Sequence, residues 1–247
     1  MNSTLPGLVV ILLTLILYAL CLLLKNWILF TPTFLKTTRV QKLRAQLTRS
    51  YEESTPIHLD LYTADDNQLV SPAVLSGLMT AENLSNQLAA ADEGLLVTDN
   101  AGPLHAFSTD AVKNGLRAAD LDQELQDRSP SFAGFDGLSH QASMLGQLDK
   151  STFGLHLNVG SAGAELALQD LMFSNDELIL TAGDNLLGQA TGLATADEVF
   201  VGEQLYELPT ATASGAVEND ISLIVMDVLR FGVLIAIAAG IALVLLV

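Results

Sequence analysis

The segment 153-FGLHLNVGSAG-163 contains the pattern that decides the fold. Residues 153–159 alternate between apolar and polar side chains, which predicts a β-strand. The sequence Gly160-Ser161-Ala162-Gly163 then predicts a tight turn that leads into a helix ending near Met172. A strand that passes through a short glycine turn into a helix is the repeating unit of α/β proteins.

The same unit recurs along the middle of the chain. The other expected strands cover residues 57–62, 94–98, 177–181 and 198–201. The other expected helices cover residues 72–91, 108–119, 138–148 and 185–193. The polar stretch 121–137, interrupted by proline and glycine, is expected to be a loop. This alternation predicts an α/β domain with a mainly parallel sheet and helices on both faces.

Two turns at the ends of expected strands are candidates for ligand binding. The backbone amides around Gly160, Ser161 and Gly163 could hold an anion, although a tight turn that needs glycine explains the same residues. Asp184 follows the next strand, where α/β sheets bind ligands. It is equally well placed to cap the helix that follows.

Catalytic and metal sites are not indicated by the sequence. The four histidines share no metal-ligand spacing, and His58 and His156 are expected to be hydrogen-bonded structural residues within strands. Ser161, a histidine and Asp184 could be combined into a hydrolase triad, but the G-x-S-x-G motif is absent. The single cysteine, Cys21, excludes an intrachain disulfide. We therefore predict no catalytic residues, no metal and no cofactor, and favour a non-enzymatic role.

Charge is distributed very unevenly. The chain has a formal net charge of −17, and residues 51–220 contain 27 acidic and four basic side chains. A domain with this charge repels phosphate backbones, which excludes nucleic acid as a partner. The acidity fits a need for solubility, a salt-rich habitat or a cationic partner.

The N-terminal region has the composition of a membrane anchor. Leu8–Leu24 is uncharged, and as a helix the apolar segment extends roughly 30 Å. Charge is absent before the segment, so we expect an uncleaved anchor over residues 1–30 rather than a signal peptide. Lys25 and Trp27 are expected at the membrane interface.

A basic segment follows this anchor directly. Residues 25–49 contain six of the eleven basic side chains and no acid, which places them in the cytoplasm and the N-terminus outside. Residues 31–54 are expected to form a basic amphipathic juxtamembrane helix. Its apolar face lies either on anionic lipid or against the domain formed by residues 55–220.

A second anchor is expected over residues 221–247. Asp227 and Arg230 lie one helical turn apart and are expected at the interface, before an uncharged run to the C-terminus. Gly232, Ala236 and Gly240 form a stripe of small residues that permits close helix packing. These features predict a two-pass protein with both termini outside and the central domain in the cytoplasm.

The C-terminal third resembles an uncharacterised bacterial membrane family, a domain of unknown function. The resemblance is carried by Ser161–Glu165, by 193-LATAD-197 continuing to 202-GEQLY-206, and by 227-DVLR-230. It implies the plasma membrane of a prokaryote and a structurally constrained position for Glu203, which we include among the candidate ligand-binding residues. It implies no activity.

These expectations favour a membrane-anchored, non-catalytic scaffold or assembly subunit. The alternatives are a small-ligand-sensing domain tethered to the membrane and, third, a membrane-bound hydrolase-like enzyme. The expected partners are the lipid bilayer and either another membrane protein or a second copy of the chain.

Overall fold

The computed structural model divides the chain into two compact units. One comprises residues 37–214 and the other comprises residues 1–36 together with 215–247. The structure describes residues 14–16, 18–20, 38–63, 71–89, 94–121, 128–148, 153–170, 178–213, 224–225 and 228–233.

The larger unit is built on a six-stranded parallel sheet, which confirms the predicted α/β class. The strands are β1 (Ile57–Tyr62), β2 (Leu95–Asp99), β3 (Ser131–Phe132), β4 (Leu155–Gly160), β5 (Leu178–Gly183) and β6 (Glu198–Val201). They lie in the order β3-β2-β1-β4-β5-β6, and every neighbouring pair is parallel. This is a doubly wound order, in which the direction of winding reverses between β1 and β4.

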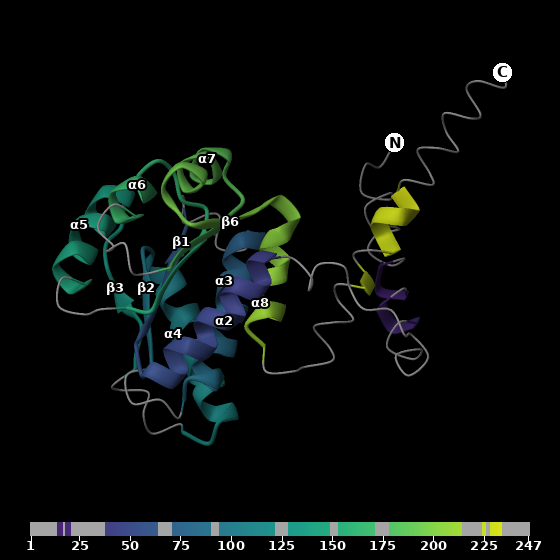
Figure 1. Ribbon diagram of the computed structural model, residues 1–247, viewed down its shortest axis with the longest axis horizontal. Helices are drawn as coiled ribbons and strands as arrows, with labels where there is room; N and C mark the ends of the chain where they lie inside the picture. The colour runs from purple at the N-terminus through teal and green to yellow at the C-terminus, as the bar shows by residue number, and fades with distance from the viewer. Residues whose placement is uncertain are drawn as a thin grey trace. The chain divides into compact units, whose positions relative to one another are not determined.

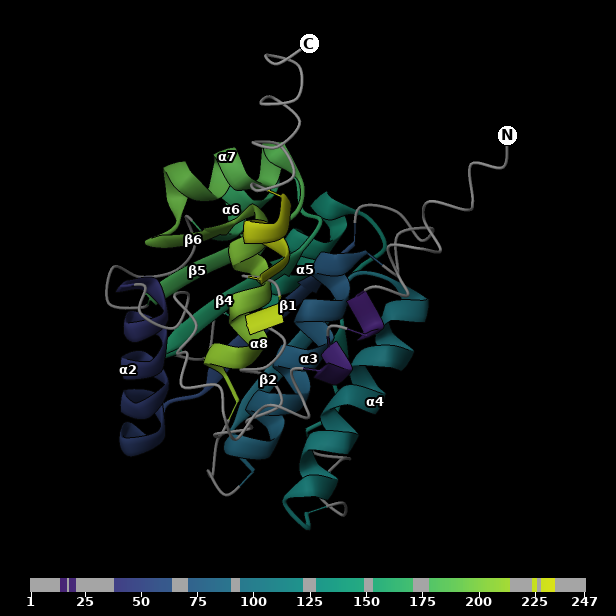
Figure 2. The same cartoon turned by 90° about the vertical axis from the view of Figure 1, so that its right-hand side faces the viewer.

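Helices cover both faces of the sheet. They are α2 (Thr38–Glu53), α3 (Pro72–Gln87), α4 (Gly102–Ala118), α5 (Gly137–Leu148), α6 (Leu166–Asp170), α7 (Leu186–Thr195) and α8 (Glu207–Ala211), with a 3-10 helix, η4 (Gly202–Tyr206), after β6. Helices α5 and α6 lie on one side of the sheet, and α2, α3 and α4 lie on the other (Figure 1). Figure 2 shows α2, α3 and α8 in front of the strands.

Several elements differ from the sequence-based expectation. Helix α4 begins at Gly102 instead of near Ser108, because Pro103 occupies its first turn, where proline has no hydrogen bond to lose. The expected loop 121–137 contains the short edge strand β3, and both η4 and α8 were not foreseen. The apolar residues of α2, Val40, Leu43 and Leu47, are buried in the main core, so this face of the basic helix packs on its own domain.

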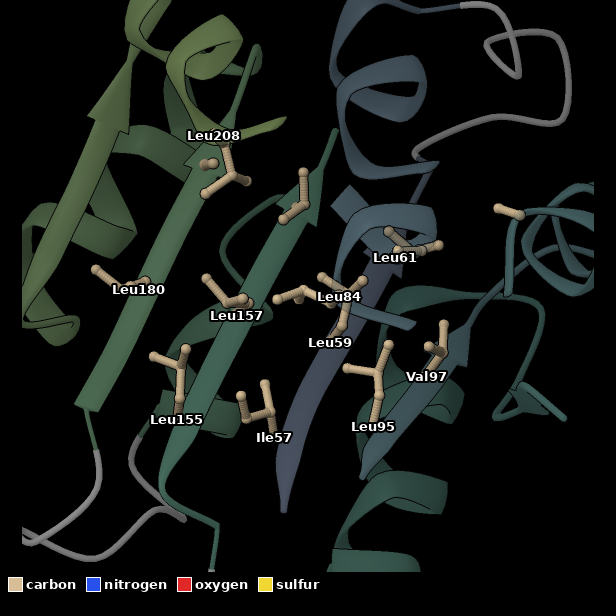
Figure 3. Close-up of a cluster of buried hydrophobic side chains, with 14 of the residues drawn as sticks. Ile57, Leu59, Leu61, Leu84, Leu95, Val97, Leu155, Leu157, Leu180 and Leu208 are labelled. Atoms are coloured by element: carbon tan, nitrogen blue, oxygen red, sulfur yellow. The ribbon is translucent and has the colours of Figure 1, made fainter. Parts of the chain in front are cut away.

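The two faces of the sheet differ in chemistry. Alternate residues of the central strands, such as Leu59 and Leu157, form an apolar layer against α3 and α8, as Figure 3 shows. The intervening residues are polar and equally buried. His58, Asp60 and His156 are each 0% exposed beneath the α5–α6 side. A parallel sheet that is covered on both faces normally has apolar residues throughout, so the polar layer is unusual.

The predicted membrane anchors fall mainly on residues outside the described ranges. Lys25, Trp27, Asp227, Ala236 and Gly240 belong to that part. Among the residues that are described, no helix is both long and apolar enough to cross a membrane. In the smaller unit, Ile224 and Val225 are buried against Tyr18 and Leu229. Arg230 is partly buried there, and Gly232 is exposed.

Close contact between α3 and α4 depends on Gly115. A Cβ atom at this position would lie 2.3 Å from the Glu82 carbonyl oxygen and 2.7 Å from the Ser85 Cβ. We expect Gly115→Ala to lower the free energy of unfolding by about 1–3 kcal/mol, because the helices must separate. Chemical denaturation of the full chain in mild detergent, followed by circular dichroism, measures this. Gly146→Ala in α5 is the matched control, since a Cβ there meets nothing within 4 Å. Equal stability of the two variants would contradict the prediction.

Candidate functional site

The predicted ligand-binding residues at the ends of β4 and β5 do come together in part. Gly160 pairs with Gly183 in the sheet, and the Ser161 hydroxyl donates a hydrogen bond to the Asp184 carboxylate. Gly160 has a φ of +145°, and a Cβ there would lie 1.9 Å from the Tyr62 carbonyl oxygen. Glycine is therefore required for β4 to approach the end of β1.

The amides that were candidates for anion binding are engaged within the protein. The Ser161 N–H donates to the Tyr62 carbonyl oxygen at 2.9 Å. The Gly163 N–H donates to Glu165 Oε1 at 2.8 Å. The first of these bonds bridges β1 and β4, where the winding of the sheet reverses and doubly wound folds usually bind their ligands. This turn therefore covers the carboxyl ends of the central strands. Neither of these two amides is available to an anion.

Other parts of the predicted site remain apart. Glu203 is exposed in η4, beyond the end of β6, and takes no part in the bonds around Ser161 and Asp184. Among the described contacts, no histidine bonds Ser161. The hypothetical hydrolase triad of Ser161, a histidine and Asp184 is therefore not assembled.

A small cavity lies beneath this turn. It is lined by residues of β4, β5 and α7, among them Asn158, Thr181 and Gly188, and holds about 10 Å³, room for one water molecule. The Thr181 Oγ1 atom is buried, and within the described part of the chain it lacks a hydrogen-bond partner. The cavity suits a structural water and is too small for a metabolite.

The second cluster is the polar layer itself, centred on Asp60 of β1. Its Oδ1 accepts from Thr98 Oγ1 at 2.7 Å and from His140 Nε2 at 2.8 Å. Its Oδ2 accepts from Gln169 Nε2 at 3.1 Å. The three donors come from β2, α5 and α6, so one carboxylate joins three elements to the central strand.

A row of hydrogen bonds extends from this carboxylate across the sheet. His58 Nε2 lies 2.9 Å from Thr98 Oγ1, and His58 Nδ1 lies 2.6 Å from His156 Nδ1. His156 Nε2 lies 3.0 Å from Asn158 Oδ1. The row ends on Asp170, which accepts from Asn158 Nδ2 at 3.1 Å and from the Thr195 hydroxyl of α7.

Asp60 and His140 form a buried ion pair. Burial by itself would raise the pKa of Asp60, but the charge of His140 and its hydrogen bond outweigh this and hold the pKa well below the usual range. Burial likewise opposes protonation of His140, yet the Asp60 carboxylate raises the His140 pKa above its ordinary value. Each group therefore favours the charged form of the other.

The rest of the row is neutral or holds its proton unusually tightly. Burial lowers the pKa of His58 to about 4, and burial together with the neighbouring His58 lowers the pKa of His156 well below its ordinary value. Burial raises the pKa of Asp170 to about 6, because removal from water disfavours the carboxylate.

A third feature, the outer face of α7, is apolar. Leu186, Leu187 and Leu193 are 82%, 56% and 65% exposed, and the helix sequence LLGQATGLAT carries no charged residue. The inner face contains Gly188 and Gly192, which allow close contact with the β4–α6 turn and with Thr181. Exposed leucines clustered on one short helix are typical of a protein-interaction surface.

The sequence predicted that His58 and His156 are hydrogen-bonded structural residues, and both are hydrogen-bonded within the sheet. It did not predict the rest of the polar layer or the α7 surface. The signal for the polar layer was the repetition of His-Leu-Asp in β1 and His-Leu-Asn in β4, which indicates a shared face but not the groups that this face meets. Within the described residues, no group of three or more histidine, cysteine, aspartate or glutamate side chains could hold a metal ion.

Comparisons with protein-family models, with curated proteins and with solved structures found no match. The functional argument therefore depends on the geometry of this chain.

The Asp60–His140 pair yields a test of the buried network. We expect His140→Gln to lower the free energy of unfolding by about 3–5 kcal/mol, because a buried carboxylate loses its counter-charge. The raised His140 pKa gives stability that is fully present below about pH 6.5, the unfolded value, and is lost as pH rises through the folded pKa. The His140→Gln variant should not lose stability in this way as the pH rises.

Chemical denaturation of the full chain in mild detergent between pH 5 and pH 9 measures both effects. His105→Gln is the matched control, because His105 Nδ1 also bonds a buried carboxylate, that of Asp99, at 2.9 Å, but its own side chain is 37% exposed. The control should cost about 1 kcal/mol or less. A His140 variant as stable as this control would refute the assignment.

Proposed function

We propose that this protein is a membrane-anchored, non-catalytic scaffold or assembly subunit whose α/β domain binds another protein. The observation that carries the proposal is the apolar outer face of α7, with three leucines more than half exposed on a domain that is otherwise strongly acidic. The glycine turn after β4 supports the same proposal, since its amides form hydrogen bonds within the protein and are not available to a ligand. A ligand-sensing role draws support from the doubly wound strand order.

The chemistry of the face defines the partner. Exposed Asp184 and Asp197 lie just before and just after α7. An apolar surface bordered by basic side chains would complement this arrangement, burying the leucines while pairing the carboxylates. Residues 51–220 of a second copy carry 27 acidic and four basic side chains, so they would complement these carboxylates poorly. We therefore propose a different membrane protein as the partner, with no nucleic acid involved.

Membrane attachment is proposed from the sequence. The uncharged terminal segments and the basic residues 25–49 support two anchors, with both termini outside and the domain in the cytoplasm of a prokaryotic cell. The resemblance of the C-terminal third to a bacterial membrane family supports the same arrangement. In this position α7 would be accessible to partners on the cytoplasmic side of the membrane.

A pull-down of the tagged full chain in mild detergent, analysed by mass spectrometry, tests the scaffold proposal. We expect the wild type to retain a membrane protein of basic surface character in a fixed ratio. The double variant Leu186→Glu with Leu193→Glu should lose at least nine-tenths of it, because charge on both leucines prevents their burial.

Leu75→Glu is the matched control for this experiment. Leu75 is 47% exposed on α3, which packs on the opposite face of the sheet. The control should retain the partner. If the wild type elutes alone and monomeric, the scaffold proposal fails, and if the α7 variant retains the partner as well as the control does, the proposed face is wrong.

Topology is tested by cysteine labelling in intact cells. In a Cys21→Ser background, Ala118→Cys places one thiol at the exposed end of α4. We expect an impermeant maleimide to label it only after the membrane is permeabilised. A cysteine added before Met1 provides the control that should be labelled from outside. Labelling of position 118 in intact cells would invert the topology.

A further inference from the structure

The hydrogen bonds of the polar layer determine which of its atoms carry a proton. Asp60 is an anion, so the hydroxyl hydrogen of Thr98 must point to Asp60 Oδ1. Thr98 can then only accept from His58, which fixes the proton of His58 on Nε2. Neutral His58 consequently presents a lone pair on Nδ1, and His156 must donate its Nδ1 proton across the 2.6 Å contact.

These assignments leave one proton undetermined, at the end of the row formed by His156, Asn158 and Asp170. If His156 is neutral, its Nε2 is an acceptor and needs a donor from Asn158. The Asn158 amide then turns its NH₂ group to His156 and its carbonyl to Asp170, which must be protonated to donate. If Asp170 is ionised instead, the Asn158 NH₂ group faces it and the carbonyl faces His156, which must then carry both ring protons.

We propose that His156, Asn158 and Asp170 form a buried binding site for a single proton, which couples the sheet to helix α7. Asp170 holds the proton while the Asn158 amide is turned toward His156. Release of the proton to solvent leaves a carboxylate, and the amide makes a half-turn to donate to it. No other atom is gained or lost in this step.

The surroundings provide for both states. Asn158 lines the small cavity between β4, β5 and α7. The charged group that acts on Asp170 directly is Asp197, just after α7. His156 reaches Asp170 through Asn158, and His58, Asp60 and His140 lie further along the row. Asp60 and His140 neutralise one another, and Asp197 opposes ionisation of Asp170.

Loss of the proton has a structural cost. With neutral His156 and ionised Asp170, the Asn158 carbonyl and the His156 Nε2 lone pair face each other at 3.0 Å, two acceptors without a hydrogen between them. The raised pKa of Asp170, about 6, gives stability that is present below the unfolded value near 4 and lost as pH rises through 6. Thr195 passes the change to α7, since its hydroxyl bonds Asp170.

Histidine ¹⁵N NMR of the full chain in mild detergent tests the site, because the protein has only four histidines. At pH 5 we expect neutral tautomers with the proton on Nε2 of His58 and on Nδ1 of His156, the latter signal assigned with His156→Gln. Between pH 5 and pH 8 the His156 resonances should shift in a single step centred near pH 6. Asp170→Asn should abolish the step, since its amide donates permanently to Asn158.

Asp110→Asn, at an exposed position of α4, is the matched control and should leave the step unchanged. If Asp170→Asn fails to fold by circular dichroism, Thr195→Val serves instead. It removes a hydrogen bond to the carboxylate and should move the step to higher pH. The proposal is overturned if His156 carries its proton on Nε2 at pH 5, if the step survives in Asp170→Asn, or if it stays in place in Thr195→Val.

Discussion

The carboxylate of Asp60 is the constraint on which the α5–α6 side of the domain depends. It lies in the middle of the sheet, fully buried, where an unpaired charge would be untenable. Thr98, His140 and Gln169 satisfy it from β2, α5 and α6. Removing any of these donors leaves a buried carboxylate oxygen without one of its hydrogen bonds. The need to satisfy this carboxylate therefore holds all three elements to β1. A buried ion pair adds little net stability, but it penalises every arrangement in which its partners separate.

The two faces of the sheet consequently serve different purposes. The apolar face, with Leu59 and Leu157 against α3 and α8, removes hydrocarbon from water and supplies the driving force for folding. The polar face supplies specificity. A slip of β1 by one residue would move Asp60 into the leucine layer and place Leu59 against His140, exchanging every contact of both faces at once. The register between β1 and β4 places His58 beside His156, and this alignment completes the row to Asp170.

Much of the fold was predictable from local patterns, and most of the site was not. Strand and helix positions follow from apolar periodicity and from glycine turns, as at Gly160. The beginning of α4 was missed because Gly102 and Pro103, which are typical turn residues, occupy the first turn of the helix. The polar layer depends on pairing between residues 98 positions apart in the chain, His58 and His156. Alternation in a strand shows which residues share a face, but it cannot show whether that face meets water or a second layer of helices.

The two faces of helix α7 meet different requirements, because the inner face packs on the sheet and the outer face meets solvent. Its inner face contains Gly188 and Gly192, which let the backbone lie against the β4–α6 turn and Thr181. The buried Gln189 donates to the Gly183 carbonyl oxygen, and Thr195 bonds Asp170, so a change at Asp170 bears directly on the helix. Its outer face carries exposed leucines and no charged residue. Because the domain as a whole is strongly acidic, such an uncharged helix face lets an apolar partner approach with a small electrostatic penalty.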